Sequence, residues 1–260
     1  MFFKKNKPWV RFVNAMPGVE VAHPIIRSQS HSFDWFRAAA SDYRERQKEH
    51  ERTPNKFLIS PTRCPGFHNF FKTGFIVTNP IDFTIETRKD SPGLFKWECP
   101  INAVFEGREY IGAHTPDQLF QFMPFREDTL SSLVKLHTRW RMYSSPDIVF
   151  LQLPIAYPDH NLFTAAHGVI DNQVLLELNV QLFWHKLEGI HLVKAGTPLC
   201  HLVPIPRDFI VDMKIDRYTE NDRYNEMAYE YLASKEWHKD IKNFFKSCKT
   251  LLTKKRSDAG

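Results

Sequence analysis

The sequence predicts a mainly β protein with a sandwich or barrel-like core, an N-terminal helix and a C-terminal helical segment. From residue 57 to about 205, short runs rich in β-branched and aromatic residues follow one another, separated by turns that contain Pro or Gly. No helical pattern interrupts this series. Strands in direct succession are typical of sandwiches and barrels, and not of βαβ units.

Residues 1–56 are predicted to form an arm followed by a helix. Three prolines in the first 30 residues prevent a long helix there, so we expect an irregular, extended arm. The helix is expected over 33–52. Ser32 or Asp34 can cap its start, alanines fill its middle, and Pro54 follows its end.

Residues 57–210 form the predicted β-rich core domain. Turn signals such as Ser145-Pro146 and Pro158-Asp159 divide it into runs of strand length. The predicted strands lie within 71–87 (two strands around Asn79-Pro80), 94–100, 131–143, 147–155, 174–184 and 197–205.

Residues 211–260 form the predicted C-terminal helical segment with a basic tail. Between 221 and 255, apolar residues such as Tyr231 and Phe245 recur at roughly helical spacing, so we expect a helix that lies against the β body. The formal net charge of the chain is +5, and part of it comes from the basic run at 249–256. No nucleic-acid-binding motif accompanies these charges, and a charged end is usually solvated.

Composition argues against several classes of protein. No apolar run is long enough to span a bilayer and the opening segment is too short and polar for a signal peptide, so we expect a cytoplasmic protein without a membrane partner. The four cysteines contain no C-x-x-C pair, which argues against a disulfide scaffold and against a zinc site built from close pairs. Five histidines fall between 160 and 201 without an H-x-H or H-x-D pair, so no metal site is predicted.

Asp171 is the candidate catalytic residue. It ends the sequence GVID, which begins at Gly168, and it leads into the strand predicted at 174–184. A carboxylate at a strand edge can orient or deprotonate a water molecule, as a general base does. The same pattern is also an ordinary turn, in which the aspartate accepts hydrogen bonds from backbone N–H groups two residues on. The sequence leaves both interpretations open.

The segment from Trp140 to Arg207 resembles the β-clip core of the dUTPase and dCTP deaminase superfamily. The resemblance rests on GVID, on the strand after it, and on GTPLCHLVPIPR, which begins at Gly196. It implies that Asp171 contacts a deoxyribose and orients the attacking water. It also implies a ligand site that includes Gly168, Asp171, Gly196 and His201, with Mg²⁺ as the cofactor if the chain hydrolyses a nucleotide.

The chain departs from that superfamily at the residues that carry the chemistry. The Tyr-Arg-Gly that follows the aspartate in the superfamily is replaced by Val174-Leu175-Leu176. The Pro-Arg-Ser that holds phosphate corresponds to Leu153-Pro154-Ile155, and the Gly-rich C-terminal arm is absent. Since a pyrophosphatase needs several donors for the phosphates, the resemblance predicts the architecture and not the activity.

Residues from about 60 to 210 resemble, more closely, an uncharacterised protein family of tailed phages, cyanophages especially. The shared motifs are Cys64-Pro65, Gly74-Phe75-Ile76 and the full ending from Gly196 to Arg207. The resemblance implies a phage origin and no particular reaction. We therefore expect a non-catalytic β-rich binding or assembly protein, either a virion component or an accessory protein in the cytoplasm of the infected host cell. The alternative is a nucleotide-binding or nucleotide-hydrolysing enzyme of dUTPase-like fold that uses Asp171.

The expected partners follow from the same reasoning. The β-clip resemblance implies a homo-oligomer, such as a trimer with strands shared between subunits. Proteins of the phage or its host are the expected binding partners, and a nucleotide is the ligand of the enzyme alternative. Arg207 and Asp208, after the last predicted strand, are expected to pair with each other or with a neighbouring subunit.

Overall fold

The computed structural model describes residues 8–31, 33–52, 60, 62, 64–99, 109–119, 127–208 and 212–234. The basic tail and the second half of the predicted C-terminal helix lie outside these residues. The chain divides into two compact units, Met1–Phe209 and Ile210–Gly260. No helix in the described part of the chain is long and apolar enough to cross a membrane.

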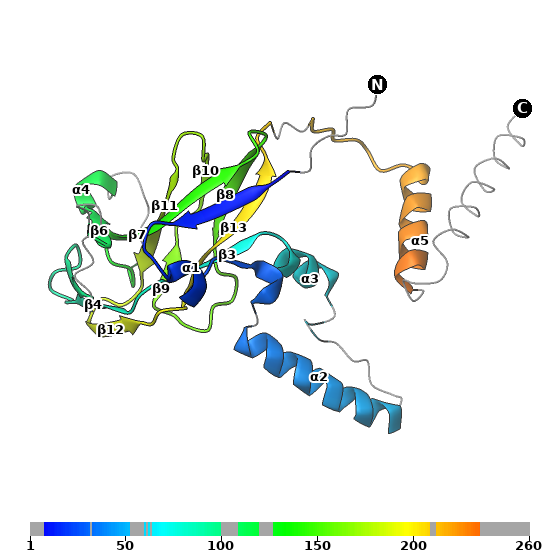
Figure 1. Cartoon of the computed structure of the whole chain (residues 1–260). Coiled ribbons are helices and arrows are strands. Elements are labelled where there is room, and N and C mark those ends of the chain that lie inside the picture. The colour runs from blue at the N-terminus through cyan, green and yellow to red at the C-terminus, as the bar shows by residue number, and fades with distance from the viewer. Residues whose placement is uncertain are drawn as a thin grey trace, which may run out of the picture. The chain divides into compact units, whose positions relative to one another are not determined.

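The first unit is built from three antiparallel sheets (Figure 1). Sheet A contains β1 (Val10–Asn14), β7 (Leu133–Ser144), β11 (Glu177–Trp184) and β9 (Phe163–Ala165) in that order, with β6 (Ile111–His114) also paired to β7. Sheet B has the order β10 (Gly168–Ile170), β8 (Ile148–Pro154), β13 (Pro198–Pro206), β3 (Phe75–Thr78) and β2 (Ile26–Arg27). Sheet C has the order β12 (Gly189–Val193), β4 (Phe83–Thr87) and β5 (Phe95–Glu98).

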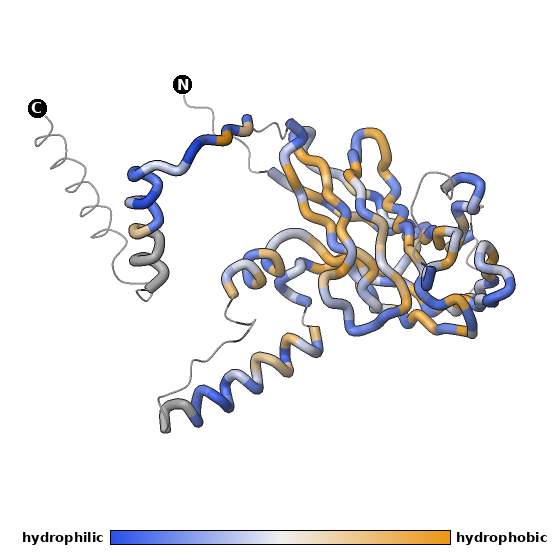
Figure 2. Tube along the Cα trace, turned by 180° about the vertical axis from the view of Figure 1, so that it is seen from behind, coloured by the Kyte–Doolittle hydropathy of each residue, from blue (hydrophilic) through white to orange (hydrophobic). Residues whose placement is uncertain are grey.

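The predicted mainly β fold is confirmed. Buried side chains from all three sheets form one apolar core, as expected of a sandwich, and the described strands form no closed barrel. In β11 the buried positions alternate strictly from Leu178 to Trp184, because successive side chains of a strand point to opposite faces. Figure 2 shows the apolar residues concentrated along the strands and polar residues over most of α2 (Asp34–Arg52).

The prediction of an irregular N-terminal arm is wrong for part of its length. Residues Val10–Asn14 form β1, which pairs with β7 along the register from Val10↔Ser144 to Asn14↔Trp140. The prolines at 8 and 17 lie outside the strand and therefore remove none of its ladder hydrogen bonds. Next to the strand, the backbone of Trp9 makes two hydrogen bonds with Ser145: its N–H donates to the Ser145 side-chain Oγ at 2.8 Å, and its carbonyl accepts from the Ser145 backbone N–H at 3.0 Å.

The helices are few. The predicted first helix is α2, and α5 (Glu220–Ser234) covers the first part of the predicted C-terminal helix; its position against the β body stays a prediction. A helix that the sequence did not predict is α3 (Pro65–Lys72), in which Pro65 occupies the first turn, where a missing N–H costs nothing. The remaining helical turns are short, and they are α1 (Val19–Ala22), η1 (Ser28–Ser30) and α4 (Pro116–Leu119).

Asn79 connects the turn between β3 and β4 to the segment that follows β12. It is fully buried, and its side-chain N–H groups donate to the carbonyls of Ile81 at 2.5 Å and Lys194 at 3.1 Å. Its side-chain oxygen accepts from the Tyr110 hydroxyl at 2.8 Å, and its carbonyl accepts from the Gly196 N–H at 2.7 Å. A buried amide whose groups are all satisfied fixes this corner of the fold.

Candidate functional site

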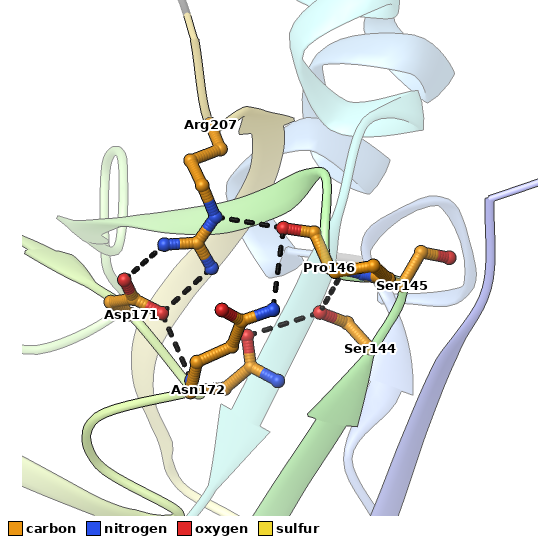
Figure 3. A network of polar contacts seen from close by, with 7 residues as sticks. Ser144, Ser145, Pro146, Asp171, Asn172 and Arg207 are labelled. Atoms are coloured by element: carbon orange, nitrogen blue, oxygen red, sulfur yellow. Dashed lines mark hydrogen bonds and ion pairs between the residues drawn. The ribbon is translucent and has the colours of Figure 1, made fainter.

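Asp171 lies in the turn between β10 and β11 and faces Arg207, the residue directly after β13. The Arg207 guanidinium binds the carboxylate with both terminal nitrogens (Figure 3), and the Nη2–Oδ1 distance is 2.8 Å. Such a two-pronged pair satisfies both carboxylate oxygens in one plane. The expected pairing of Arg207 with Asp208 is therefore wrong, because the acidic partner of the guanidinium is Asp171; the alternative of pairing with a neighbouring subunit stays a prediction.

The ion pair belongs to a network that joins three segments of the chain. The Arg207 Nε donates to the carbonyl of Pro146 at 2.7 Å, and the Arg207 backbone N–H donates to the carbonyl of Asp147 at 2.8 Å. The Ser144 hydroxyl donates to the Asn172 side-chain oxygen at 3.0 Å (Figure 3). The turn between β7 and β8, the turn between β10 and β11, and the end of β13 are thus held together.

Asp171 also forms the ordinary turn that was the alternative to a catalytic role for the GVID motif. Its Oδ1 accepts a hydrogen bond from the Gln173 N–H at 2.9 Å, two residues on. Its carbonyl accepts from the N–H groups of Val174 at 3.0 Å and Leu175 at 2.9 Å. This is the turn geometry that aspartate side chains stabilise, so the carboxylate serves the local backbone as well as Arg207.

The environment of Asp171 favours its ionised form. Hydrogen bonds from Arg207, and then the Gln173 N–H, lower the pKa of the carboxyl to about 2 from an ordinary 3.8. A general base works best when its pKa lies near the operating pH. A carboxylate that binds its proton this weakly, and whose two oxygens already accept hydrogen bonds, is poorly suited to activate water.

Of the other predicted ligand residues, the structure places Gly168 near Asp171 and the remaining two elsewhere. Gly168 opens β10, three residues before Asp171, where it pairs with Gln152. Gly196 occupies the turn before β13 at φ 85°, whereas Arg207 follows the other end of that strand. Gly168 and Asp171 thus share one edge of sheet B, and Gly196 belongs to the opposite end of the fold.

His201 is a buried residue of the core and not a neighbour of Asp171. Its Nε2 lies 2.5 Å from the Thr73 carbonyl oxygen, and the Phe70 ring packs edge-on against it at 5.0 Å. Burial lowers the pKa of the imidazole, so the neutral form is favoured. The contacts of this side chain are those of a satisfied core histidine.

An exposed apolar loop that was not predicted as a functional surface adjoins the ion pair. Val174, Leu175 and Leu176, hereafter the 174–176 loop, follow the Asp171 turn and are 77%, 60% and 47% exposed. Val169, two residues before Asp171, is also exposed. The Met142 N–H donates to the Leu176 carbonyl at 2.9 Å, which fixes the end of the loop to β7. The replacement of Tyr-Arg-Gly by three apolar residues was the signal that could have identified this surface.

The described residues contain no group of three His, Cys, Asp or Glu side chains arranged to hold a metal ion. Four of the clustered histidines, His160, His185, His191 and His201, instead have separate local contacts; the two ring nitrogens of His185, for example, lie 2.9 Å and 2.6 Å from the hydroxyls of Thr129 and Thr164. No protein-family model matches the chain, and no curated protein matches it.

Proposed function

We propose that the chain is a non-catalytic β-rich binding or assembly protein. The observation that carries the proposal is the state of Asp171, whose carboxylate is held by Arg207 and by the Gln173 N–H. The residue that would have to activate water is thereby used to connect β13 with the turn before β11. This supports a scaffold role for the motif and gives no support to hydrolysis.

The 174–176 loop supports binding as the activity. Adjacent exposed aliphatic side chains are uncommon in monomeric proteins and mark interaction surfaces. The loop starts from the Asp171 turn and ends at the hydrogen bond between Met142 and Leu176, so its backbone is held at both ends. A pre-organised apolar loop loses little conformational freedom when a partner covers it. The partner we propose is a protein of the phage or of its host.

The proposed binding takes place during a phage infection. The motifs from Cys64-Pro65 to Arg207 that resemble the tailed-phage family are its basis. In that setting the protein is either a virion component or an accessory protein in the host cytoplasm. Quantitative mass spectrometry of purified particles and of infected-cell extract would distinguish the two, because a virion component is enriched in the particles.

A nucleotide assay tests the non-catalytic part of the proposal. The protein is incubated with each deoxynucleoside triphosphate and Mg²⁺, and pyrophosphate release and the melting temperature are measured. We expect no turnover and no shift at millimolar nucleotide. Turnover that disappears in Asp171→Asn would overturn the proposal in favour of a dUTPase-like enzyme with an altered substrate.

Site-specific photo-crosslinking tests the binding part. A photoreactive residue replaces Leu175 in one variant and Val21 in another, since Val21 is at least as exposed as Leu175 but lies in α1. In infected cells we expect a discrete protein adduct from position 175 and none from position 21. Equal adducts from both positions, or none from either, would contradict binding through the 174–176 loop.

A further inference from the structure

Strand β12 is an edge strand whose outer side is open in the described part of the chain. It pairs with β4 along the register from Gly189↔Thr87 to Val193↔Phe83, and sheet C ends there. Figure 1 shows β12 beside β4 at the margin of the β-rich body. An open edge presents unpaired backbone N–H and C=O groups, which makes it a template for another strand.

The side chains of β12 make this edge unusually apolar. Ile190 and Leu192 are 70% and 47% exposed, and their alternate spacing places them on the same face of the sheet. Val193 points the other way and is buried in the core. Proteins usually protect an exposed edge with lysine, proline or an inward-pointing charge, and the strand GIHLV contains none of these.

The residues that flank β12 carry opposite charges in a symmetric arrangement. Glu188 precedes the strand, Lys194 follows it, and both are exposed. No ion pair involves either side chain within the residues that the structure describes. Read outward from His191, the sequence EGIHLVK places Glu188 and Lys194 at equal distances from the centre, with Ile190 and Leu192 between them.

We propose that two copies of this chain pair through β12 in an antiparallel, two-fold symmetric ladder centred on His191. In this register Ile190 lies opposite the Leu192 of the second copy, and Glu188 lies opposite its Lys194. Each of these contacts occurs twice, because a two-fold interface uses the same surface on both subunits. Aliphatic and opposite-charge pairs directly across an antiparallel ladder are both stabilising.

The competing registers are less favourable. A shift of one residue would place the exposed face of one strand beside the core face of the other. A shift of two residues in one direction would oppose Ile190 to itself and bring Lys186 opposite Lys194, which is a like-charge contact. Only the ladder centred on His191 pairs both aliphatic side chains and both charges at the same time. The proposal does not depend on the function of the 174–176 loop, which lies between β10 and β11 and not in sheet C.

Charge exchange between Glu188 and Lys194 tests the interface. Sedimentation of the full chain should give a mass twice the monomer value of 30.6 kDa. Glu188→Lys and Lys194→Glu, made separately, each create two like-charge contacts and should raise the dissociation constant of the dimer by roughly tenfold or more. The double variant Glu188→Lys/Lys194→Glu restores opposite charges and should dimerise like the unmodified protein.

Mixing the two single variants provides the decisive control. In a mixed dimer every charge pair is again opposite, so the equimolar mixture should recover the dimer that each variant alone has lost. Ile190→Lys, which places a charge against an aliphatic partner, should weaken the dimer independently. A monomer throughout the accessible concentration range, or an oligomer unaffected by the single variants and by Ile190→Lys, would overturn the proposal without bearing on the Asp171 assay. A mixture that stays monomeric would overturn the His191-centred register.

Discussion

At the scale of single residues, Asp171 shows how one motif can serve two purposes. The sequence allowed a general base or a turn, and the structure shows the turn together with Arg207 as an ionic partner. The turn could be predicted because the aspartate bonds the backbone two residues away. The ion pair could not, because Arg207 is 36 residues distant and reaches Asp171 only through the pairing of β13, β8 and β10.

The low pKa of Asp171 predicts a specific dependence of stability on pH. A carboxyl whose pKa is about 2 in the folded state and 3.8 when unperturbed stabilises the fold above pH 3.8, and this contribution disappears as the pH falls towards 2. Asp171→Asn keeps the acceptor for Gln173 but removes the charge, so it should lower the melting temperature at pH 7. The difference from the unmodified protein should shrink between pH 4 and pH 2. Calorimetry checks this, with Asp208→Asn as an exposed control that should change little.

Gly74 gives a second prediction at this scale. It adopts φ 80°, and a Cβ there would lie 2.1 Å from the Leu202 carbonyl oxygen. Gly74→Ala should therefore destabilise the fold by at least about 2 kcal/mol. Gly168→Ala, where a Cβ meets nothing within 4 Å, should stay within about 0.5 kcal/mol of the unmodified protein. Equal urea midpoints for the two variants would contradict the close packing of β3 on β13.

At the scale of elements, long strands with a buried face could be predicted from the sequence. Strands whose conformation depends on pairing with a neighbouring strand could not. The runs that became β7, β8, β11 and β13 are long and apolar, and each was predicted near its observed bounds. β9, β10 and β12 were missed; they have three to five residues, and runs this short give a periodic pattern too weak to predict a strand unless turn residues such as Asn79-Pro80, between β3 and β4, also mark it. β1 was missed because the prolines around it argued for a loop, whereas its pairing with β7 decides its conformation.

The connection made by Asn79 predicts an element-scale effect on stability. Tyr110→Phe leaves the buried side-chain oxygen of Asn79 without its hydrogen-bond donor and should cost about 2 kcal/mol. Asn79→Ala removes the links to both Ile81 and Lys194, and it should cost about 3 kcal/mol or more. Tyr143→Phe, on an exposed side chain, is the matched control. Denaturant titration checks the order, and a loss for Tyr143→Phe as large as that for Tyr110→Phe would contradict it.

At the scale of the whole molecule, the buried apolar core found among the described residues lies in the first unit. Every buried residue of the main core cluster lies between Val19 and Leu202. Removal of the second unit, Ile210–Gly260, should therefore leave the cooperative unfolding of the first unit intact. Circular dichroism melting of the full and shortened chains checks this. A lower melting temperature for the shortened chain would show that the second unit stabilises the first.

The candidate site at Asp171, in contrast, could be predicted only in part. Its surface is formed by segments far apart in the sequence, and the sequence does not show which of them lie side by side in the fold. The motif identified Asp171 and Gly168 as neighbours, and they share one edge of sheet B. Gly196 and His201 were assigned to the same site by resemblance, but β13 places one at its far end and buries the other in the core. Membership of a shared sequence motif therefore says little about whether two residues contact each other in the folded protein.

The turn between β7 and β8 holds both ends of the folded body. Trp9 is hydrogen-bonded to Ser145 at the start of this turn, and the Arg207 N–H donates to the Asp147 carbonyl at its end. The two ends of the folded body are therefore both bound to the three-residue segment 145–147. A short peptide could join Arg207 to Trp9, and the chain could be reopened at the hairpin between β4 and β5. Such a circular permutant should retain the sandwich, and it would leave the 174–176 loop free of any covalent extension.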